Sequence, residues 1–175
     1  MLRKGLSLVE TIVVIAVIVT LIGISVPVFG KFRGKADSLA CQENLRTLGG
    51  GLEFYLQDNN SRMPEISITA QQSEEGAPEE EVTLRSVLTP YVDKVECFHC
   101  PADDEIFALT GCSYGWNSLI NDQHRANLNF LGNKEDLTSL PVIFDIEAFH
   151  GEKDGTNFLY ADYSSNNRVT FKTTP

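Results

Sequence analysis

Apolar residues fill the amino-terminal part of the chain on every side and leave no polar stripe. From Thr11 to Phe29 there are 19 consecutive residues without a charge, rich in Val and Ile. A helix of this length spans about 30 Å, which matches the hydrocarbon core of a bilayer. A surface helix of a soluble protein keeps a polar face, and a cleaved secretory signal peptide has a shorter apolar region. The pattern therefore predicts a membrane-spanning helix over residues 6–30.

The apolar pattern changes to a helical periodicity after residue 30. Apolar residues recur at spacings of three and four, which places them on one face of a helix. This stripe consists of Cys41, Leu45, Leu48, Leu52, Tyr55 and Leu56. It predicts that the helix continues over residues 31–58 and packs this face onto a sheet. Gly49, Gly50 and Gly51 interrupt the pattern, which predicts either close packing or a local irregularity at this point.

The remaining sequence alternates a polar segment with short apolar runs. Residues 59–82 are acidic and interrupted by Pro and Gly, which is typical of a mobile surface loop. Residues 83–175 then form the predicted globular, β-rich head. A short helix is expected at Thr83–Leu88, strands at Leu140–Ile146, Asn157–Tyr163 and Arg168–Lys172, and a hairpin turn at Ser164–Asn167. The predicted fold class is α+β, with a long amino-terminal helix packed on a small antiparallel sheet.

Charges near the apolar segment suggest a function for it. Glu10 lies at its start, and a carboxylate in hydrocarbon costs a few kcal/mol unless it is paired or protonated. Its position therefore indicates a functional role, with an acid that reaches the membrane interface as the alternative. Basic residues lie on both sides of the segment, so their count does not decide its orientation. Pro27 predicts a kink or local melting of the helix.

The residues from Lys4 to Glu10, followed by the apolar helix and Pro27, resemble the class III signal of type IV prepilins and type II secretion pseudopilins. This resemblance implies that a prepilin peptidase removes the basic leader, residues 1–5, after Gly5 and methylates the new terminus at Leu6. It implies a cytoplasmic amino terminus, a single inner-membrane helix and an exterior, periplasmic head. It also implies a helical filament in which Glu10 neutralises the amino terminus of a neighbouring subunit.

The head is similar to a pseudopilin-like group that carries a carboxy-terminal H-x9-DG signature. The similar segments are Cys41–Arg46, Cys100–Asp103, Ser113–Asn117, and His150 through Asp162. Eleven residues separate His150 from Asp162 in this chain, and Tyr163 stands in place of the glycine. A two-residue insertion in the turn over residues 151–157 accounts for the longer spacing.

The charge of the head restricts its partners. Residues 31–175 contain 12 Lys and Arg against 23 Asp and Glu, a formal net charge of −11. This balance argues against nucleic acid as a partner. The chain also has no phosphate-binding loop, dinucleotide fingerprint or nucleophile elbow. These observations favour a structural protein without catalytic residues, for which partner proteins hydrolyse ATP.

Four cysteines leave several kinds of site open. Cys97 and Cys100 have the two-residue spacing of a zinc knuckle or redox pair, and Cys41 and Cys112 complete a set of four. An exterior head favours disulfides, for which three pairings exist, while a zinc site and free thiols are the alternatives. Asp154 and Asp162 are candidate calcium ligands in an acidic carboxy-terminal region. No calcium-binding spacing is present, so turn-forming, solvated acids are favoured there.

The sequence as a whole indicates a filament subunit, and a pseudopilin of a type II secretion system is favoured. The expected partners are further copies of the chain, other pilins or pseudopilins, prepilin peptidase and an inner-membrane assembly platform. The alternatives are a type IV pilin and an uncleaved, membrane-anchored domain that binds metal or another ligand. No cofactor is predicted beyond the possible zinc or calcium.

Overall fold

A computed structural model describes residues 8–67, 82–128, 137–151 and 155–167. The side chains of residues 26–28 and 31 lie outside this description. The chain forms two units, residues 1–36 and 37–175, and each is considered by itself.

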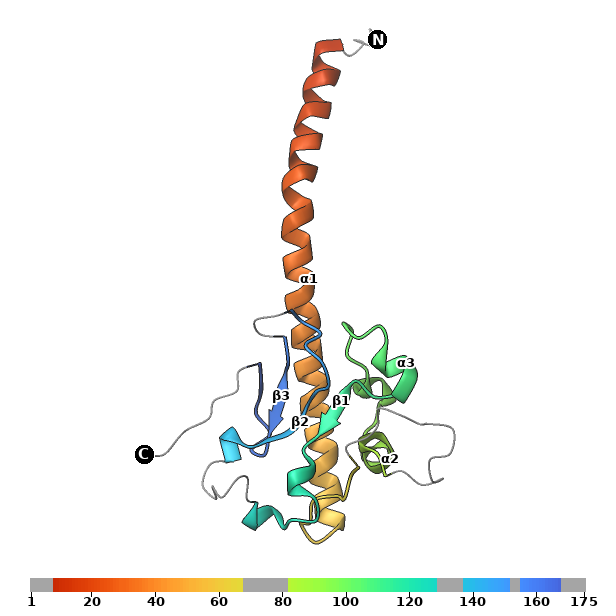
Figure 1. The fold of residues 1–175 in the computed structure, drawn as a ribbon. Coiled ribbons are helices and arrows are strands. Elements are labelled where there is room, and N and C mark those ends of the chain that lie inside the picture. Colours follow the sequence, from red (N-terminus) through yellow and green to blue (C-terminus); the bar gives the residue numbers. More distant parts are fainter. Residues whose placement is uncertain (1–7, 68–81, 129–136, 152–154, 168–175) are drawn as a thin grey trace, which may run out of the picture. The chain divides into compact units, whose positions relative to one another are not determined.

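The first element is a long helix, α1, which runs from Leu8 to Asp58 (Figure 1). The apolar periodicity predicted that the helix continues to residue 58, and this prediction is confirmed. The helical assignment continues through Pro27. The local melting predicted at this proline is therefore not observed.

The other helices of the head are short. Thr83 caps α2 (Leu84–Leu88) through a capping box with Ser86, which confirms the helix predicted after the acidic segment. A second helix, α3 (Ile106–Thr110), ends at Gly111, whose φ of 74° lies in the left-handed region. Single 3-10 turns are η1 (Thr89–Tyr91), η2 (Val95–Phe98), η3 (Ser118–Ile120), η4 (Arg125–Asn127) and η5 (Leu137–Ser139).

The strands form one four-stranded antiparallel sheet in the order β1-β2-β3-β4. They are β1 (Tyr114–Trp116), β2 (Pro141–Asp145), β3 (Phe158–Tyr160) and β4 (Ser165–Asn166). The α+β architecture and the strands corresponding to β2 and β3 agree with the sequence prediction. The strand expected at residues 168–172 lies outside the described residues.

The last hairpin differs from the prediction in the position of its turn. Ser165 and Asn166, which were expected in the turn, pair with β3 as β4. The chain reverses earlier, where Tyr163 takes a φ of 66°. Its backbone N–H donates to the carbonyl of Tyr160 at 2.8 Å. A tight turn with one left-handed residue therefore brings β4 back sooner than the run of Ser and Asn suggested.

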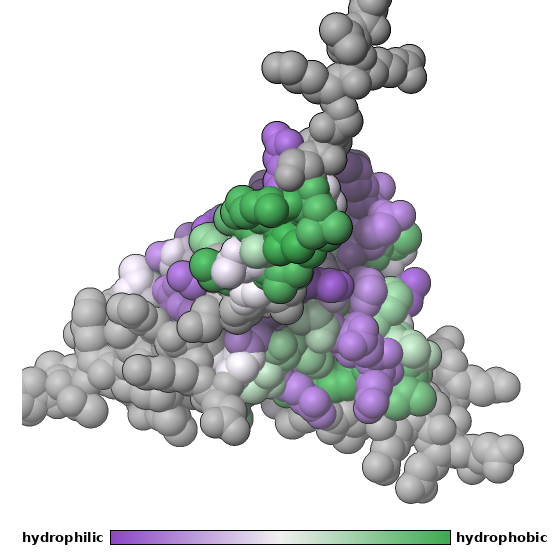
Figure 2. All heavy atoms as spheres, turned by 90° about the horizontal axis from the view of Figure 1, so that it is seen from above, coloured by the Kyte–Doolittle hydropathy of each residue, from purple (hydrophilic) through white to green (hydrophobic). Residues whose placement is uncertain are grey.

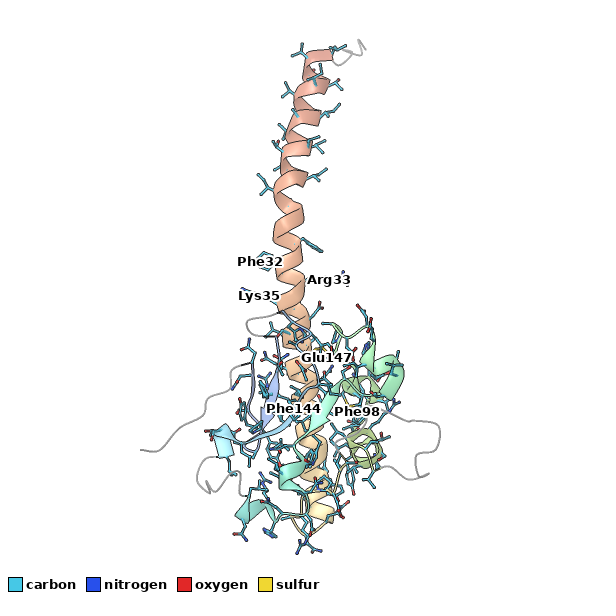
Figure 3. The ribbon with its side chains drawn as sticks, in the orientation of Figure 1. Phe32, Arg33, Lys35, Phe98, Phe144 and Glu147 are labelled. Carbon is cyan, nitrogen blue, oxygen red and sulfur yellow. A yellow bond between two sulfur atoms is a disulfide. The ribbon has the colours of Figure 1, made fainter. Side chains whose placement is uncertain are left out.

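The core of the head lies between the later part of α1 and the sheet (Figure 1). The predicted stripe of α1 faces this core, with Leu45, Leu48 and Leu52 fully buried. Phe98 and Phe144, labelled in Figure 3, belong to the segments around it, and Phe98 has no exposed surface. The amphipathic continuation of the helix is therefore a packing surface, as predicted.

The start of the predicted acidic loop is part of this packed structure. Met63 and Ile66 are buried in the core. The backbone N–H of Ser67 donates to the carbonyl of Val82 at 3.1 Å, which joins the two ends of the acidic segment. Residues 68–81, to which most of the loop prediction applies, lie outside the described residues.

The triple glycine of α1 contains one exposed and two packed positions. A Cβ at Gly51 would lie 2.7 Å from Val92 Cγ1, and one at Gly49 would lie 3.1 Å from Leu159 Cδ2. A Cβ at Gly50 would meet no atom within 4 Å. The helix passes through all three without interruption, so close packing is the correct alternative of the two predicted.

These contacts predict opposite effects for two otherwise identical substitutions. Gly50→Ala is expected to raise the free energy of unfolding of the head by about 0.5–1 kcal/mol, because alanine favours a helix. Gly51→Ala is expected to be about 1–3 kcal/mol less stable than Gly50→Ala, because its methyl group overpacks against Val92. Denaturant unfolding of the two variants, followed by near-UV circular dichroism, measures the difference. Equal stabilities would contradict this packing.

Candidate functional site: an apolar helix and a buried histidine centre

The amino-terminal half of α1 exposes an apolar surface. Of the helices in the described part of the chain, one has a segment long and apolar enough to cross a membrane, Leu8–Ser25. All of its side chains are exposed. A soluble domain rarely presents so large an apolar surface to water, which makes this segment a candidate for membrane insertion or for contact with other helices.

Charged residues mark both ends of this apolar segment. Glu10 lies in the first turn of α1, where an acid is favoured by the positive end of the helix dipole. Arg33 and Lys35 follow the segment on the same helix; in Figure 3 Lys35 lies on the same side of the helix as the exposed Phe32, and Arg33 lies on the other side. The leader and the predicted processing residues, Gly5 and Leu6, lie outside the described residues.

Polar and apolar side chains are unevenly distributed over the surface. Figure 2 shows apolar side chains gathered into one continuous group in the view from above. An apolar group of this kind marks a surface that another molecule or a lipid phase covers.

The head contains a second candidate site, a buried cluster that we term the histidine centre: Cys41, Cys100, Asp145, His150 and Asn157. Cys41 lies on the core face of α1 and is bonded to Cys100, which follows η2. The Nε2 atom of His150 lies 3.4 Å from Cys100 Sγ and 3.6 Å from Asp145 Oδ2. The side chains of His150 and Asp145 are 1% and 0% exposed. Segments far apart in sequence thus meet at one point.

A hydrogen-bond network fixes the carboxylate of this centre. The backbone N–H and the side-chain amide of Asn157 both donate to Asp145 Oδ2, at 2.8 and 2.9 Å. Ser38 Oγ and Gln42 Nε2 donate to Asn157 Oδ1 at 3.1 and 3.0 Å. The first turns of α1 within the head therefore hold Asn157, which in turn holds Asp145.

Burial determines the protonation of the centre. It raises the pKa of Asp145 to about 6, although the two hydrogen bonds from Asn157 oppose the shift. It lowers the pKa of His150, against the raising effect of the negative charge of Asp37. The distance between His150 and Asp145 would suit an ion pair, but both shifts favour the neutral forms. The imidazole is therefore neutral at neutral pH.

Two polar atoms of the centre have no hydrogen-bond partner among the described residues. They are Asp145 Oδ1 and His150 Nδ1, and both are buried. A buried polar atom without a partner is unfavourable by about 1–3 kcal/mol, so such atoms call for an explanation.

The cysteines predicted as candidate ligands or disulfide partners divide into two pairs. Cys41 and Cys100 form the disulfide, which is one of the pairings left open by the sequence. Cys97 and Cys112 are buried free thiols. Burial raises the pKa of Cys97 to about 11 and that of Cys112 to about 12, so both remain protonated. Among the described residues, the ligand atoms that converge belong to Cys41, Cys100 and His150, and the four cysteines do not meet at one point.

Of the two predicted calcium ligands, Asp162 forms a turn. Its Oδ1 atom accepts hydrogen bonds from the backbone and hydroxyl of Ser164, at 2.9 and 2.6 Å. Asp154 lies outside the described residues. The contacts of Asp162 fit the expectation that these acids form turns.

Tyr163 has a φ of 66°, a left-handed conformation that is unusual for a bulky residue and that glycine adopts more readily. The hydroxyl of Tyr163 donates to Glu53 Oε2 at 2.5 Å, and the guanidinium of Arg125 lies 4.9 Å from the centre of its ring. Arg125 also pairs with Glu53. These contacts hold the tyrosine in a conformation that its backbone alone would disfavour.

The convergence of His150, Asp145 and Asn157 on the disulfide was not predicted from the sequence. His150 was noted only as part of a signature, and Asp145 only as a residue within the predicted strand Leu140–Ile146. Asn157 lies 12 residues from Asp145, Cys100 lies 50 residues from His150, and Ser38 lies 119 residues from Asn157. No local spacing reveals these contacts.

In comparisons with known proteins, no family model, no curated protein and no solved structure matches the chain.

Proposed function

We propose that this chain is a structural subunit of a type IV-like filament, and specifically a pseudopilin of a type II protein secretion system. The observation that carries the proposal is the exposed apolar segment Leu8–Ser25 with a single acid, Glu10, in its first turn. A helix that serves only to cross a membrane does not need an acid such as Glu10 within its apolar segment. An acid whose partner is the amino terminus of the next subunit specifies the axial position of each copy.

The resemblance of residues 4–10 to a class III signal supports the same function. It supplies the processing step, in which prepilin peptidase cuts after Gly5 and leaves Leu6 as the methylated terminus. Cleavage removes the basic leader and creates the positive amino terminus that Glu10 would neutralise. The class III signal and Glu10 would therefore act together, because cleavage at the signal creates the charge that Glu10 pairs with.

The disulfide supports an exterior position for the head. Disulfides persist in oxidising compartments, and Cys41–Cys100 is buried in the core of the head. The chain would then have a cytoplasmic amino terminus, one helix in the inner membrane and a periplasmic head. Its partners would be further copies, other pseudopilins, the peptidase and the assembly platform.

Thiol labelling in cells tests this orientation. Cells are lysed in denaturant with a maleimide polymer, with or without prior reduction, and the labelled chain is resolved on gels. An exterior head predicts two labelled thiols, Cys97 and Cys112, without reduction, and four after reduction. Four labelled thiols without reduction would indicate a cytoplasmic head and contradict the proposed orientation. A fibre long enough to be seen at the cell surface would instead favour a type IV pilin.

A further inference from the structure

The histidine centre contains more potential metal ligands than its disulfide uses. Cys41 Sγ, Cys100 Sγ and a ring nitrogen of His150 all lie within 4.8 Å of one another. Asp145 Oδ2 adds a carboxylate oxygen 3.6 Å from His150 Nε2. Two sulfurs, one imidazole nitrogen and one carboxylate oxygen make up a ligand set that suits zinc, because soft thiolates and imidazole favour this ion over calcium or magnesium.

Two of the distances between these atoms match those of a tetrahedral zinc site. With zinc about 2.3 Å from sulfur and about 2.0–2.1 Å from nitrogen and oxygen, adjacent S and N ligands lie about 3.5 Å apart and N and O ligands about 3.4 Å apart. The observed separations are 3.4 Å for Cys100 Sγ and His150 Nε2, and 3.6 Å for His150 Nε2 and Asp145 Oδ2. On reduction the two sulfurs would separate to about 3.8 Å. The Asp145 carboxylate lies outside the group of ligand atoms that are all within 4.8 Å of one another, so it must also move toward the sulfurs to become the fourth ligand.

The surroundings of the centre are those of a prepared site. The side chains of Asp145 and His150, which carry the proposed ligand atoms Oδ2 and Nε2, are nine-tenths or more buried. Asn157 orients the carboxylate through two hydrogen bonds, and Ser38 and Gln42 orient Asn157. Outer contacts of this kind hold ligands in position for a metal.

We propose that the reduced head binds one zinc ion at the histidine centre through Cys41, Cys100, His150 and Asp145. The disulfide and the metal are alternative ways of joining α1 to the segment around Cys100. A dithiol or phosphine reductant donates two electrons to the Cys41–Cys100 bond, and two protons complete the thiols. Zinc then binds the two thiolates and releases both protons. This inference concerns the head alone and does not depend on filament assembly.

Metal analysis of the full chain in detergent tests the proposal. The chain is reduced with a phosphine, incubated with zinc chloride, passed through a desalting column and analysed by elemental mass spectrometry. One zinc per chain is expected after reduction and less than about 0.1 in the oxidised sample. His150→Gln and Asp145→Asn are each expected to weaken binding at least 10-fold. Cys97→Ser and Cys112→Ser, which alter the two thiols outside the centre, are the matched controls and should retain one zinc.

Cobalt substitution supplies a measurement that does not depend on the folding of a variant. Tetrahedral thiolate ligation predicts intense visible absorption and a sulfur-to-cobalt charge-transfer band in the reduced wild-type chain, and both should disappear after reoxidation. Absence of zinc and of these bands from the reduced, folded chain would overturn the proposal. Retention of zinc by Cys41→Ser together with its loss from Cys97→Ser would also overturn it, because the metal would then lie elsewhere.

Discussion

Replacement of Glu10 by alanine is expected to abolish filament assembly while the chain still inserts and its head still folds. Glu10 lies in the first turn of an exposed apolar helix. In a bundle of such helices the positive amino terminus of each subunit would be buried in a medium of low dielectric. Removal of one partner from a buried ion pair typically costs about 3–5 kcal/mol, and this loss recurs at every subunit of a fibre. The yield of sheared fibres should fall at least 10-fold.

Two variants separate this effect from a general loss of stability. Glu10→Asp keeps the charge on a shorter side chain and should retain part of the yield. Thr20→Ala removes a hydroxyl that donates to the Ala16 and Val17 carbonyls of the same helix, and it should assemble normally. Membrane fractionation and the intact disulfide report on insertion and folding. A normal fibre yield from Glu10→Ala would be incompatible with the proposed role of the acid.

Loss of the Cys41–Cys100 disulfide is expected to be the largest stability effect in the head. The bond joins residues 59 positions apart. Closure of a loop of this size restricts the unfolded chain by about 4 kcal/mol in the chain-entropy model, and about 2–4 kcal/mol is usually measured. The double variant Cys41→Ser/Cys100→Ser should therefore lower the free energy of unfolding by about 2–4 kcal/mol in the presence of a chelator. Denaturant unfolding of the full chain in detergent measures this change.

A reductant distinguishes the disulfide from the packing of the two side chains. Phosphine treatment should destabilise the wild-type chain and leave the double variant unchanged, because Cys97 and Cys112 are already free thiols. Equal stabilities of the oxidised and reduced wild-type chain, with zinc removed, would show that the bond does not hold the head together.

The sequence predicts α1 because the pattern that identifies this helix is formed by residues close to one another along the chain. The apolar run and the three-and-four spacing each lie within a few turns, and the end of α1 at Asp58 agrees with them. β1 was missed because Tyr114–Trp116 is three residues long and includes Gly115, which carries no strand signal. Its glycine is explained only by the fold, since a Cβ there would lie 2.9 Å from the ring of Phe144.

The candidate sites also differ in whether the sequence alone could predict them. The apolar segment and Glu10 can be recognised along the chain, whereas the histidine centre joins α1, the segment after η2, the end of β2 and the segment between β2 and β3. Four cysteines allow three pairings, and no spacing selects Cys41 with Cys100. Asn157 was predicted only as the first residue of a strand, although it holds Asp145 in place. Such contacts depend on packing between distant segments.

The mature amino terminus is the most direct test of the filament account. The chain is produced in membranes that contain an active prepilin peptidase, purified, and its amino-terminal peptide is identified by mass spectrometry. The account predicts a terminus at methylated Leu6, which follows cleavage after Gly5. An intact terminus at Met1 in the presence of active peptidase would contradict it, and would favour an uncleaved, membrane-anchored domain.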